Sequence, residues 1–169
     1  MDVANGPGVR MSLFVSGCTH YCKNCFNQEA WDFGYGKPFT DKEIEMIVNY
    51  VSGEYIAGLS QLGGEPLEPE NQKGILPLLR RMKEVCPEKS IWCYTGYDFE
   101  KDVLGRMMEE IPETKEILSY LDVLVDGEYQ EENHNLSLRF KGSSNQRIIM
   151  VQDSLRAGKI VLWDGQRQK

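Results

Sequence analysis

Short apolar segments alternate with amphipathic segments along most of this chain, and this alternation restricts the possible folds more than any other feature. The apolar segments are predicted to be strands, and they cover residues 11–16, 56–62, 90–95 and 121–126. The segments between them are predicted to be helices, because their apolar residues recur every three or four positions. This strand–helix order predicts a parallel sheet with right-handed crossovers.

The predicted helices also carry signals at their ends. Thr40 and Glu43 have the spacing of a capping box, which indicates that a helix opens there. Pro112 is expected to separate the last two helical segments, since proline interrupts a helix interior. The predicted helical segments cover residues 44–51, about 72–85, 98–110 and 113–120.

The alternation ends after Gly127. Residues 128–135 are polar and are predicted to form a loop. Beyond them the sequence predicts three short strands, at residues 136–140, 147–152 and 159–163.

Length and charge narrow the class of protein. A closed eight-stranded (β/α) barrel uses about 250 residues, so 169 residues predict one α/β domain over 1–169 without such a barrel. The net charge of −7 and the pI of about 4.9 argue against a nucleic-acid partner. The sequence contains no long apolar run, and its first ten residues resemble neither a signal nor a transit peptide. We therefore expect a cytoplasmic protein without a membrane segment.

The cysteines divide into a tight group and two lone residues. Cys18, Cys22 and Cys25 have the spacing C-x3-C-x2-C, in a segment that we call the cysteine loop (residues 18–25), whereas Cys86 and Cys93 are remote. An odd number of cysteines without a secretion signal argues against a disulfide framework. The group of three indicates a metal or cofactor site, and the two lone cysteines are expected in the core.

Three thiolates fit an iron–sulfur cluster better than a zinc ion. A structural zinc site needs four ligands, and His20 would have to fold back sharply to complete a tetrahedron with its neighbours Cys18 and Cys22. A [4Fe–4S] cluster also takes four ligands, so three thiolates leave one iron open to bind a small molecule. His20 is expected beside the site rather than as a ligand. A non-catalytic zinc or electron-transfer module is the alternative, and metal analysis separates the two.

Four distinctive segments follow the predicted strands. They are the cysteine loop and residues 63–66, 95–97 and 126–127. Ligands of parallel α/β sheets bind beyond the carboxyl ends of the strands. We therefore expect these four segments to line one site.

The cysteine loop after the first strand resembles the signature of the radical S-adenosylmethionine superfamily. The resemblance implies an incomplete (β/α) barrel and a [4Fe–4S] cluster held by Cys18, Cys22 and Cys25. It also implies that S-adenosylmethionine binds the fourth iron and is cleaved reductively to methionine and a 5′-deoxyadenosyl radical, which abstracts hydrogen. Tyr21 and Asn24 are expected around the cluster, although many members of the superfamily carry an aromatic residue where Asn24 stands.

Residues 63–66 strengthen this resemblance. Gly63, Gly64, Glu65 and Pro66 are similar to the GGEP motif that holds the amino group of S-adenosylmethionine in that superfamily. Glycines let a backbone approach a ligand closely, and carbonyl groups or the Glu65 carboxylate can accept hydrogen bonds from an ammonium. Taken alone, the motif is equally consistent with a strand-to-helix turn.

Two further resemblances concern the strand ends and the N-terminal segment. Residues 5–10 (NGPGVR) resemble the segment before the first strand of glycyl-radical activating enzymes. Thr95 and Asp126 stand at strand ends where the superfamily contacts the ribose or carboxylate of S-adenosylmethionine, or a bound cation. For each of these two residues, a solvated strand end is an equally good interpretation.

Residues 140–147 (FKGSSNQR) point to one branch of these activating enzymes. They resemble a stretch of the enzymes that activate anaerobic ribonucleotide reductases, although a hairpin turn is the alternative. The resemblance implies that reductase as the protein substrate, with a low-potential electron donor such as flavodoxin. Activation of another glycyl-radical enzyme such as pyruvate formate-lyase, or radical chemistry on a small molecule, stays open. Relatives of this kind often carry a few residues ahead of the position of Met1.

Overall fold

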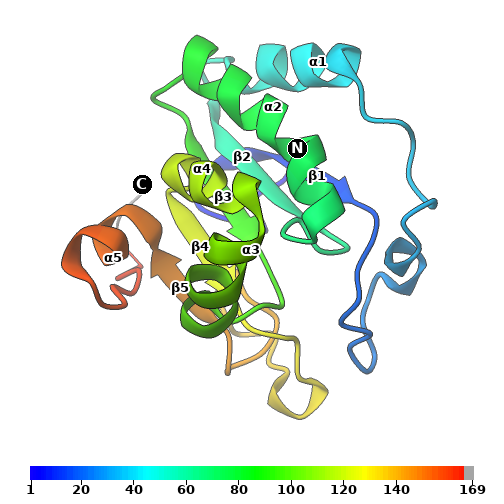
Figure 1. Cartoon of the computed structure of the whole chain (residues 1–169), viewed down its shortest axis with the longest axis vertical. Helices are drawn as coiled ribbons and strands as arrows, with labels where there is room; N and C mark the ends of the chain where they lie inside the picture. The colour runs from blue at the N-terminus through cyan, green and yellow to red at the C-terminus, as the bar shows by residue number, and fades with distance from the viewer. Residues whose placement is uncertain (166–169) are drawn as a thin grey trace.

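The computed structural model describes residues 1–165 (Figure 1). Two of its short helices, η1 and η3, are 3-10 helices, and η2 is a π-helical segment that runs into α3. Among the described residues, no helix combines the length and the apolar character needed to cross a membrane. In chain order the elements are β1 (Val9–Val15), η1 (Gln28–Trp31), α1 (Asp41–Val51), β2 (Ile56–Gly63), α2 (Pro69–Val85), β3 (Ser90–Tyr94), η2 (Phe99–Met107), α3 (Met108–Glu110), α4 (Pro112–Tyr120), β4 (Val123–Asp126), η3 (Glu131–Asn133), β5 (Arg147–Met150) and α5 (Val151–Ala157).

The five strands form one sheet in the order β1-β2-β3-β4-β5. Strands β1 to β4 are parallel to their neighbours, and β5 is antiparallel to β4. Leu59 of β2 thus lies between Met11 of β1 and Ile91 of β3. The predicted parallel sheet is confirmed. Within residues 1–165 the strands β1 and β5 are its two edges, so the sheet is open.

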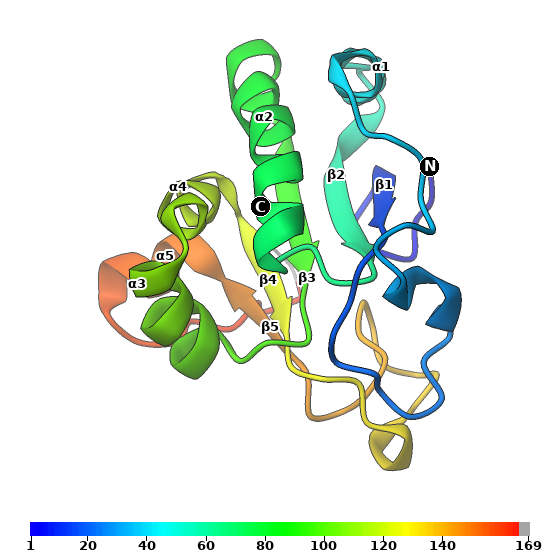
Figure 2. The ribbon, with the colours of Figure 1, turned by 45° about the vertical axis from the view of Figure 1, so that its right-hand side comes forward.

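Helices cover one face of this sheet (Figures 1 and 2). The apolar stripe of α1 is buried against it as predicted, and the N–H of Thr40 donates to the Glu43 carboxylate at 2.9 Å where that helix opens. Leu79 of α2 and Ile117 of α4 pack in the same core with Leu124 of β4. Burial of these stripes is the main force that holds the helices on the sheet.

The opposite face of the sheet holds a buried arginine. Arg10 of β1 is fully buried, and its guanidinium donates to the hydroxyls of Ser60 (2.8 Å) and Ser90 (2.9 Å) and to the carbonyl oxygen of Leu59 (2.8 Å). It also lies 5.5 Å from the ring centre of Trp92. Burial lowers the pKa of Arg10 to about 10, although nearby negative groups oppose that shift. The hydrogen bonds supply the partners that a buried charge requires.

The strands predicted at 136–140 and 159–163 are wrong. The first segment is irregular, and the second pairs with β5 only through an isolated bridge at Leu162 and a backbone hydrogen bond on either side of it. Their aromatic residues Phe140 and Trp163 pack edge-on against Trp92 of β3, each with a ring-centre distance of 5.7 Å. The apolar pattern of residues 136–140 therefore indicated burial against the sheet, which does not require the backbone pairing of a strand. Residues 159–163 do bond to the backbone of β5, but over too short a stretch to form a strand.

The strand predicted at 147–152 is too long. Strand β5 ends at Met150, and Val151 begins α5, which the sequence interpretation missed. Gly158 follows this helix with a φ of +63°, the left-handed conformation that commonly terminates helices. A short apolar run does not by itself distinguish a strand from a helix.

Two helices begin at prolines. Helix α2 begins at Pro69, before the predicted start near residue 72, and α4 begins at Pro112, which was expected only to interrupt a helix. Proline is well tolerated at the first helical position, because the N–H that it lacks has no acceptor within the helix.

Candidate functional site

A cavity of about 430 Å³ lies at the carboxyl ends of the strands. Its wall comes from the cysteine loop, the turns after β2 and β3, the loop after β4, residues 4–5 and several residues between 134 and 146. Figures 1 and 2 show the loop after β1 and the loop after β4 at the same end of the molecule. Small-molecule sites have volumes of about 300–1,000 Å³. The fold thus brings together the four segments that were expected to line one site.

All three cysteines of the cysteine loop line this cavity. The loop reverses direction because Tyr21 and Asn24 adopt positive φ angles of 52° and 56°. The N–H of Cys25 donates to the carbonyl oxygen of Cys22 at 3.1 Å. Asn24 is part of the cavity wall, whereas the ring of Tyr21 packs edge-on against Trp31 at a ring-centre distance of 5.1 Å.

The thiols of Cys18 and Cys22 are neutral when nothing is bound to them. Burial raises the pKa of each to about 11. Metals bind the thiolate form, so binding at this loop releases protons. Three sulfur donors around one cavity fit an iron–sulfur cluster. Over residues 1–165, no three His, Cys, Asp or Glu side chains converge on a position for a single metal ion.

The last residue of β2, Gly63, and the Gly64 that follows it are required by backbone packing. Gly63 has a φ of +116°, and a Cβ there would lie 2.6 Å from the backbone nitrogen of Val15. A Cβ on Gly64 would lie 2.5 Å from the carbonyl oxygen of Gly17. These glycines therefore pack directly on the end of β1 and on Gly17, just before the cysteine loop. The glycines were expected to let a ligand approach the backbone. The structure shows a second reason for glycine here, because the protein's own backbone leaves no room for a side chain at either position.

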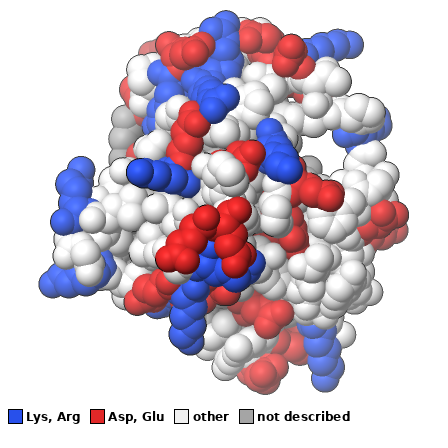
Figure 3. All heavy atoms as spheres, viewed as in Figure 1, with Lys and Arg blue, Asp and Glu red and all other residues white. Residues whose placement is uncertain are grey.

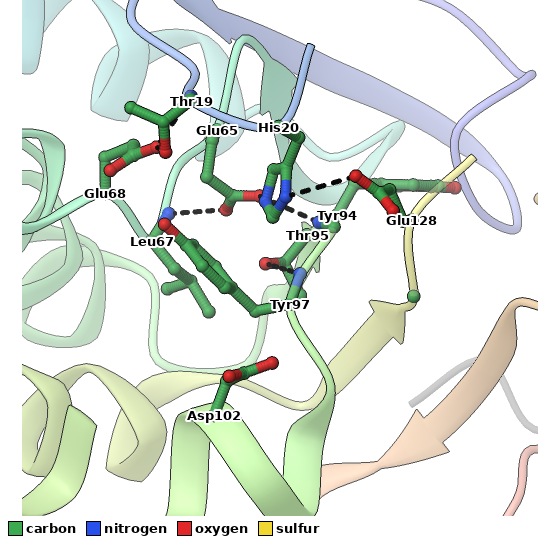
Figure 4. A network of polar contacts seen from close by, with 12 residues as sticks. Thr19, His20, Glu65, Leu67, Glu68, Tyr94, Thr95, Tyr97, Asp102 and Glu128 are labelled. Carbon is green, nitrogen blue, oxygen red and sulfur yellow. Dashed lines mark hydrogen bonds and ion pairs between the residues drawn. The ribbon is translucent and has the colours of Figure 1, made fainter. Parts of the chain in front are cut away.

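Two buried carboxylates connect the turn after β2 to the cysteine loop (Figure 4). Glu65 Oε2 lies 3.0 Å from Nε2 of His20. Glu68 Oε1 accepts from the N–H (2.8 Å) and the hydroxyl (2.5 Å) of Thr19. Glu65 was expected to receive a ligand ammonium, but its carboxylate is engaged within the protein. Glu68 was not predicted, and the available signal was its position directly before Pro69, at the N-cap of α2.

His20 lines the cavity together with the cysteines. Its Nδ1 is 3.8 Å from the carboxylate of Glu128, and its ring packs edge-on against Tyr97 at 4.5 Å (Figure 4). Burial lowers the pKa of His20, but the hydrogen bond with Glu65 and the charges of Glu65 and Glu128 outweigh burial, so the pKa lies above its ordinary value. This position agrees with the interpretation of His20 as a neighbour of the metal ligands.

Thr95 and Asp126 have different surroundings. Thr95 lines the cavity, and its hydroxyl accepts from the N–H of Tyr97 at 3.1 Å. Asp126 is buried and accepts from the N–H of Phe99 (2.9 Å) and from Nε of Arg147 (3.0 Å). The Asp126 carboxylate therefore connects β4 to β5 and to the start of η2, and its contact with S-adenosylmethionine stays a prediction.

Residues 140–147 are part of the cavity wall and not a free hairpin. The Gln146 side chain accepts from the N–H of Gly142 (2.8 Å) and donates to the carbonyl oxygen of Gly127 (2.9 Å). Phe140 adopts a φ of +59°, which is unusual for an aromatic residue. These contacts tie the segment to the loop after β4, so the segment closes one side of the cavity.

Comparisons with known proteins agree with this geometry. A family model described as a 4Fe-4S single cluster domain matches residues 4–149. A protein from Haemophilus influenzae is 42% identical over 149 residues, which cover 87% of this chain and 91% of that protein. Relatives from Escherichia coli (38% identical, covering 88% and 92%) and from Enterobacteria phage T4 (40% identical, covering 87% and 87%) are also similar. All three are named anaerobic ribonucleoside-triphosphate reductase-activating proteins. No solved structure matches the chain significantly.

Proposed function

Because this chain belongs to the family of anaerobic ribonucleoside-triphosphate reductase-activating proteins, we propose that it generates a glycyl radical on an anaerobic (class III) ribonucleotide reductase. The observation that carries this proposal is the placement of Cys18, Cys22 and Cys25 around one cavity with the Gly63–Gly64 turn. Three thiol donors without a fourth protein ligand suit a [4Fe–4S] cluster with one open iron.

The proposed cofactors are this cluster and S-adenosylmethionine. When bound, they supply a 5′-deoxyadenosyl radical by reductive cleavage of the sulfonium, and this radical takes a Cα hydrogen from a glycine of the reductase. Gly63, Gly64, Glu65 and Thr95 form the proposed contact with S-adenosylmethionine, since they lie on the cavity wall. Glu65 and Pro66 complete the buried turn that holds those glycines in place.

The proposed substrate is a protein, and the open sheet suits that role. We assign the fold as an incomplete (β/α) barrel in a single domain over 1–169, because the parallel strands end at one cavity while the edge strands β1 and β5 stay unpaired with each other within residues 1–165. A backbone loop of the reductase can approach through such an opening.

The remaining parts of the proposal are the electron donor and the compartment. A low-potential donor such as flavodoxin fits the need to reduce the cluster, and the cytoplasm fits a protein that uses reduced thiols. On the face seen in Figure 1, acidic and basic side chains are interspersed (Figure 3). This mixed surface suits protein partners better than nucleic acid.

The test is anaerobic reconstitution followed by reduction and mixing with candidate partners. We expect about four irons with matching sulfide per chain, and a glycyl radical signal by EPR with the anaerobic ribonucleotide reductase. Pyruvate formate-lyase serves as the control partner and is expected to give no signal, because the relatives are named for the reductase. One zinc per chain without a radical signal would support the non-catalytic alternative instead.

A further inference from the structure

Two side chains that follow β2 form hydrogen bonds with residues of the cysteine loop. We propose that Glu65 and Glu68 are positioning residues that hold Thr19 and His20, and thereby set the placement of Cys18 and the rest of the loop for cluster binding. Thr19 and His20 directly follow Cys18 in the sequence, and each is bound by one of the two carboxylates (Figure 4). This inference rests on the proposed function, since it assumes that these cysteines hold the cluster.

Glu65 is a fixed support because the protein binds it from several sides. Its side chain is 1% exposed. Oε1 accepts from the N–H of Leu67 at 2.8 Å, and Oε2 accepts from the N–H of Gly96 at 2.7 Å. These donors belong to the turns after β2 and β3, so the carboxylate links the ends of two central strands to His20. The sheet thus determines where His20 stands.

The two residues before the cysteine loop are held in a similar way. The Asn71 side-chain amide donates to the carbonyl oxygens of Ser16 (3.0 Å), Gly17 (3.3 Å) and Glu65 (2.8 Å). The loop itself forms no helix or strand between Ser16 and Asn27. Its geometry therefore depends on these outside partners. Loss of a residue that orients a metal ligand typically lowers metal affinity by about 10–100-fold.

Replacement of the carboxylate by an amide is expected to disturb the hydrogen bonds of Glu65 but not those of Glu68. Both oxygens of Glu65 accept from backbone N–H groups, so a Glu65→Gln change places an NH2 group against one of these donors. Both contacts to Thr19 use a single oxygen of Glu68, and the other polar partner is the hydroxyl of Tyr97, which can also accept. Glu68→Gln can therefore keep its contacts, whereas Glu68→Ala cannot. A role of negative charge alone would make the two Gln variants equivalent.

The experiment compares iron retention by anaerobically reconstituted variants under a chelator challenge, together with the EPR spectrum of the reduced cluster. Glu65→Gln and Glu68→Ala are expected to bind iron about 10–100-fold more weakly and to give altered spectra. Glu68→Gln is expected to rescue the loss seen in Glu68→Ala. His20→Gln keeps an N–H group at the reach of Nε2 and should retain iron better than His20→Leu.

A matched control distinguishes a general loss of stability from a specific effect on cluster binding. Thr114→Val removes a buried hydroxyl that donates to Gln72 at 2.8 Å, away from the cysteine loop, and should lower the melting temperature without changing the EPR spectrum. If Glu65→Gln unfolds, the comparison of Glu68→Gln with Glu68→Ala decides the inference. Wild-type iron retention and spectra in Glu65→Gln and Glu68→Ala would overturn it. Failure of the wild-type chain to bind a cluster would instead overturn the proposed function.

Discussion

At the scale of residues, position relative to the cavity divides the five cysteines into two kinds. Cys18, Cys22 and Cys25 line the cavity, whereas Cys86 ends α2 and Cys93 lies in β3, both inside the helical core. Burial raises the pKa of Cys93 well above its ordinary value, so this thiol behaves as a small apolar group. The same residue type thus serves chemistry in one place and packing in another.

This division predicts two outcomes for cysteine substitutions. Cys18→Ala, Cys22→Ala and Cys25→Ala are each expected to abolish cluster assembly, because no nearby side chain supplies another thiolate. Cys86→Ala and Cys93→Ala should assemble the cluster at a stability cost of about 1 kcal/mol, as is typical of point mutations. Iron and sulfide analysis after anaerobic reconstitution, with urea denaturation for stability, tests both groups. Full iron content in any of the first three variants would contradict the cluster assignment.

At the scale of elements, β2 is the strand on which the site depends. It pairs with β1 and β3, and its end carries the glycines that pack on the end of β1 and on Gly17, just before the cysteine loop. Gly58 sits where β2, β3 and the buried Arg10 approach one another, because a Cβ there would lie 1.9 Å from the carbonyl oxygen of Ser90. Gly74, in contrast, is exposed in the middle of α2, and a Cβ added there would have no neighbouring atom within 4 Å.

These two glycines predict opposite effects of the same change. Gly58→Ala is expected to lower the free energy of unfolding by about 1–3 kcal/mol or more, because the added methyl forces β2 and β3 apart. Gly74→Ala should raise it by about 0.5–1 kcal/mol, since alanine favours a helix interior. Urea denaturation of the two proteins without cofactor measures both values. Equal effects would show that backbone packing at Gly58 is not tight.

At the scale of the whole molecule, the cavity is built from segments far apart in the sequence. Residues 4–5, the cysteine loop and residues between 134 and 146 meet around it. A ligand that binds this cavity therefore stabilises contacts between segments near both ends of the described chain. Binding to the folded state alone raises stability according to the ligand concentration relative to its Kd.

This arrangement predicts that cofactor binding is visible in thermal unfolding. S-adenosylmethionine at about 100 times its Kd should add about 2.7 kcal/mol to the cluster-bound protein, which corresponds to about 5–10 °C in melting temperature for a chain of this size. The Cys25→Ala protein should show no such shift. Prolonged exposure to air should remove the shift together with iron and activity, because the open iron lacks a protein ligand. An unchanged shift after aeration would contradict the proposed site.

The sequence by itself determined the parallel sheet, the first four strands and the grouping of the cysteines. These features can be predicted from short stretches of sequence, because the periodicities of strands and helices involve residues that are close together in the chain. The connection rules of parallel sheets then bring the strand ends to one edge, which is why the cysteine loop and the Gly63–Gly64 turn could be expected together. Pro69 and Pro112 are also local signals, because proline favours the first position of a helix, and α2 and α4 begin at these residues.

Only the tertiary structure decided which partner each polar side chain takes. Glu65 faces His20 instead of open space, Glu68 holds Thr19, and Asp126 binds Arg147. Each of these contacts joins residues that are far apart in the sequence, and side-chain direction across such a separation depends on how the strands align. Tertiary packing likewise decided that Phe140 covers the sheet from a loop, because an apolar side chain needs a buried surface but not a particular backbone hydrogen-bond partner. Trp163 covers the same tryptophan, Trp92, from beside β5, where its N–H donates to the carbonyl oxygen of Ile148 at 2.8 Å.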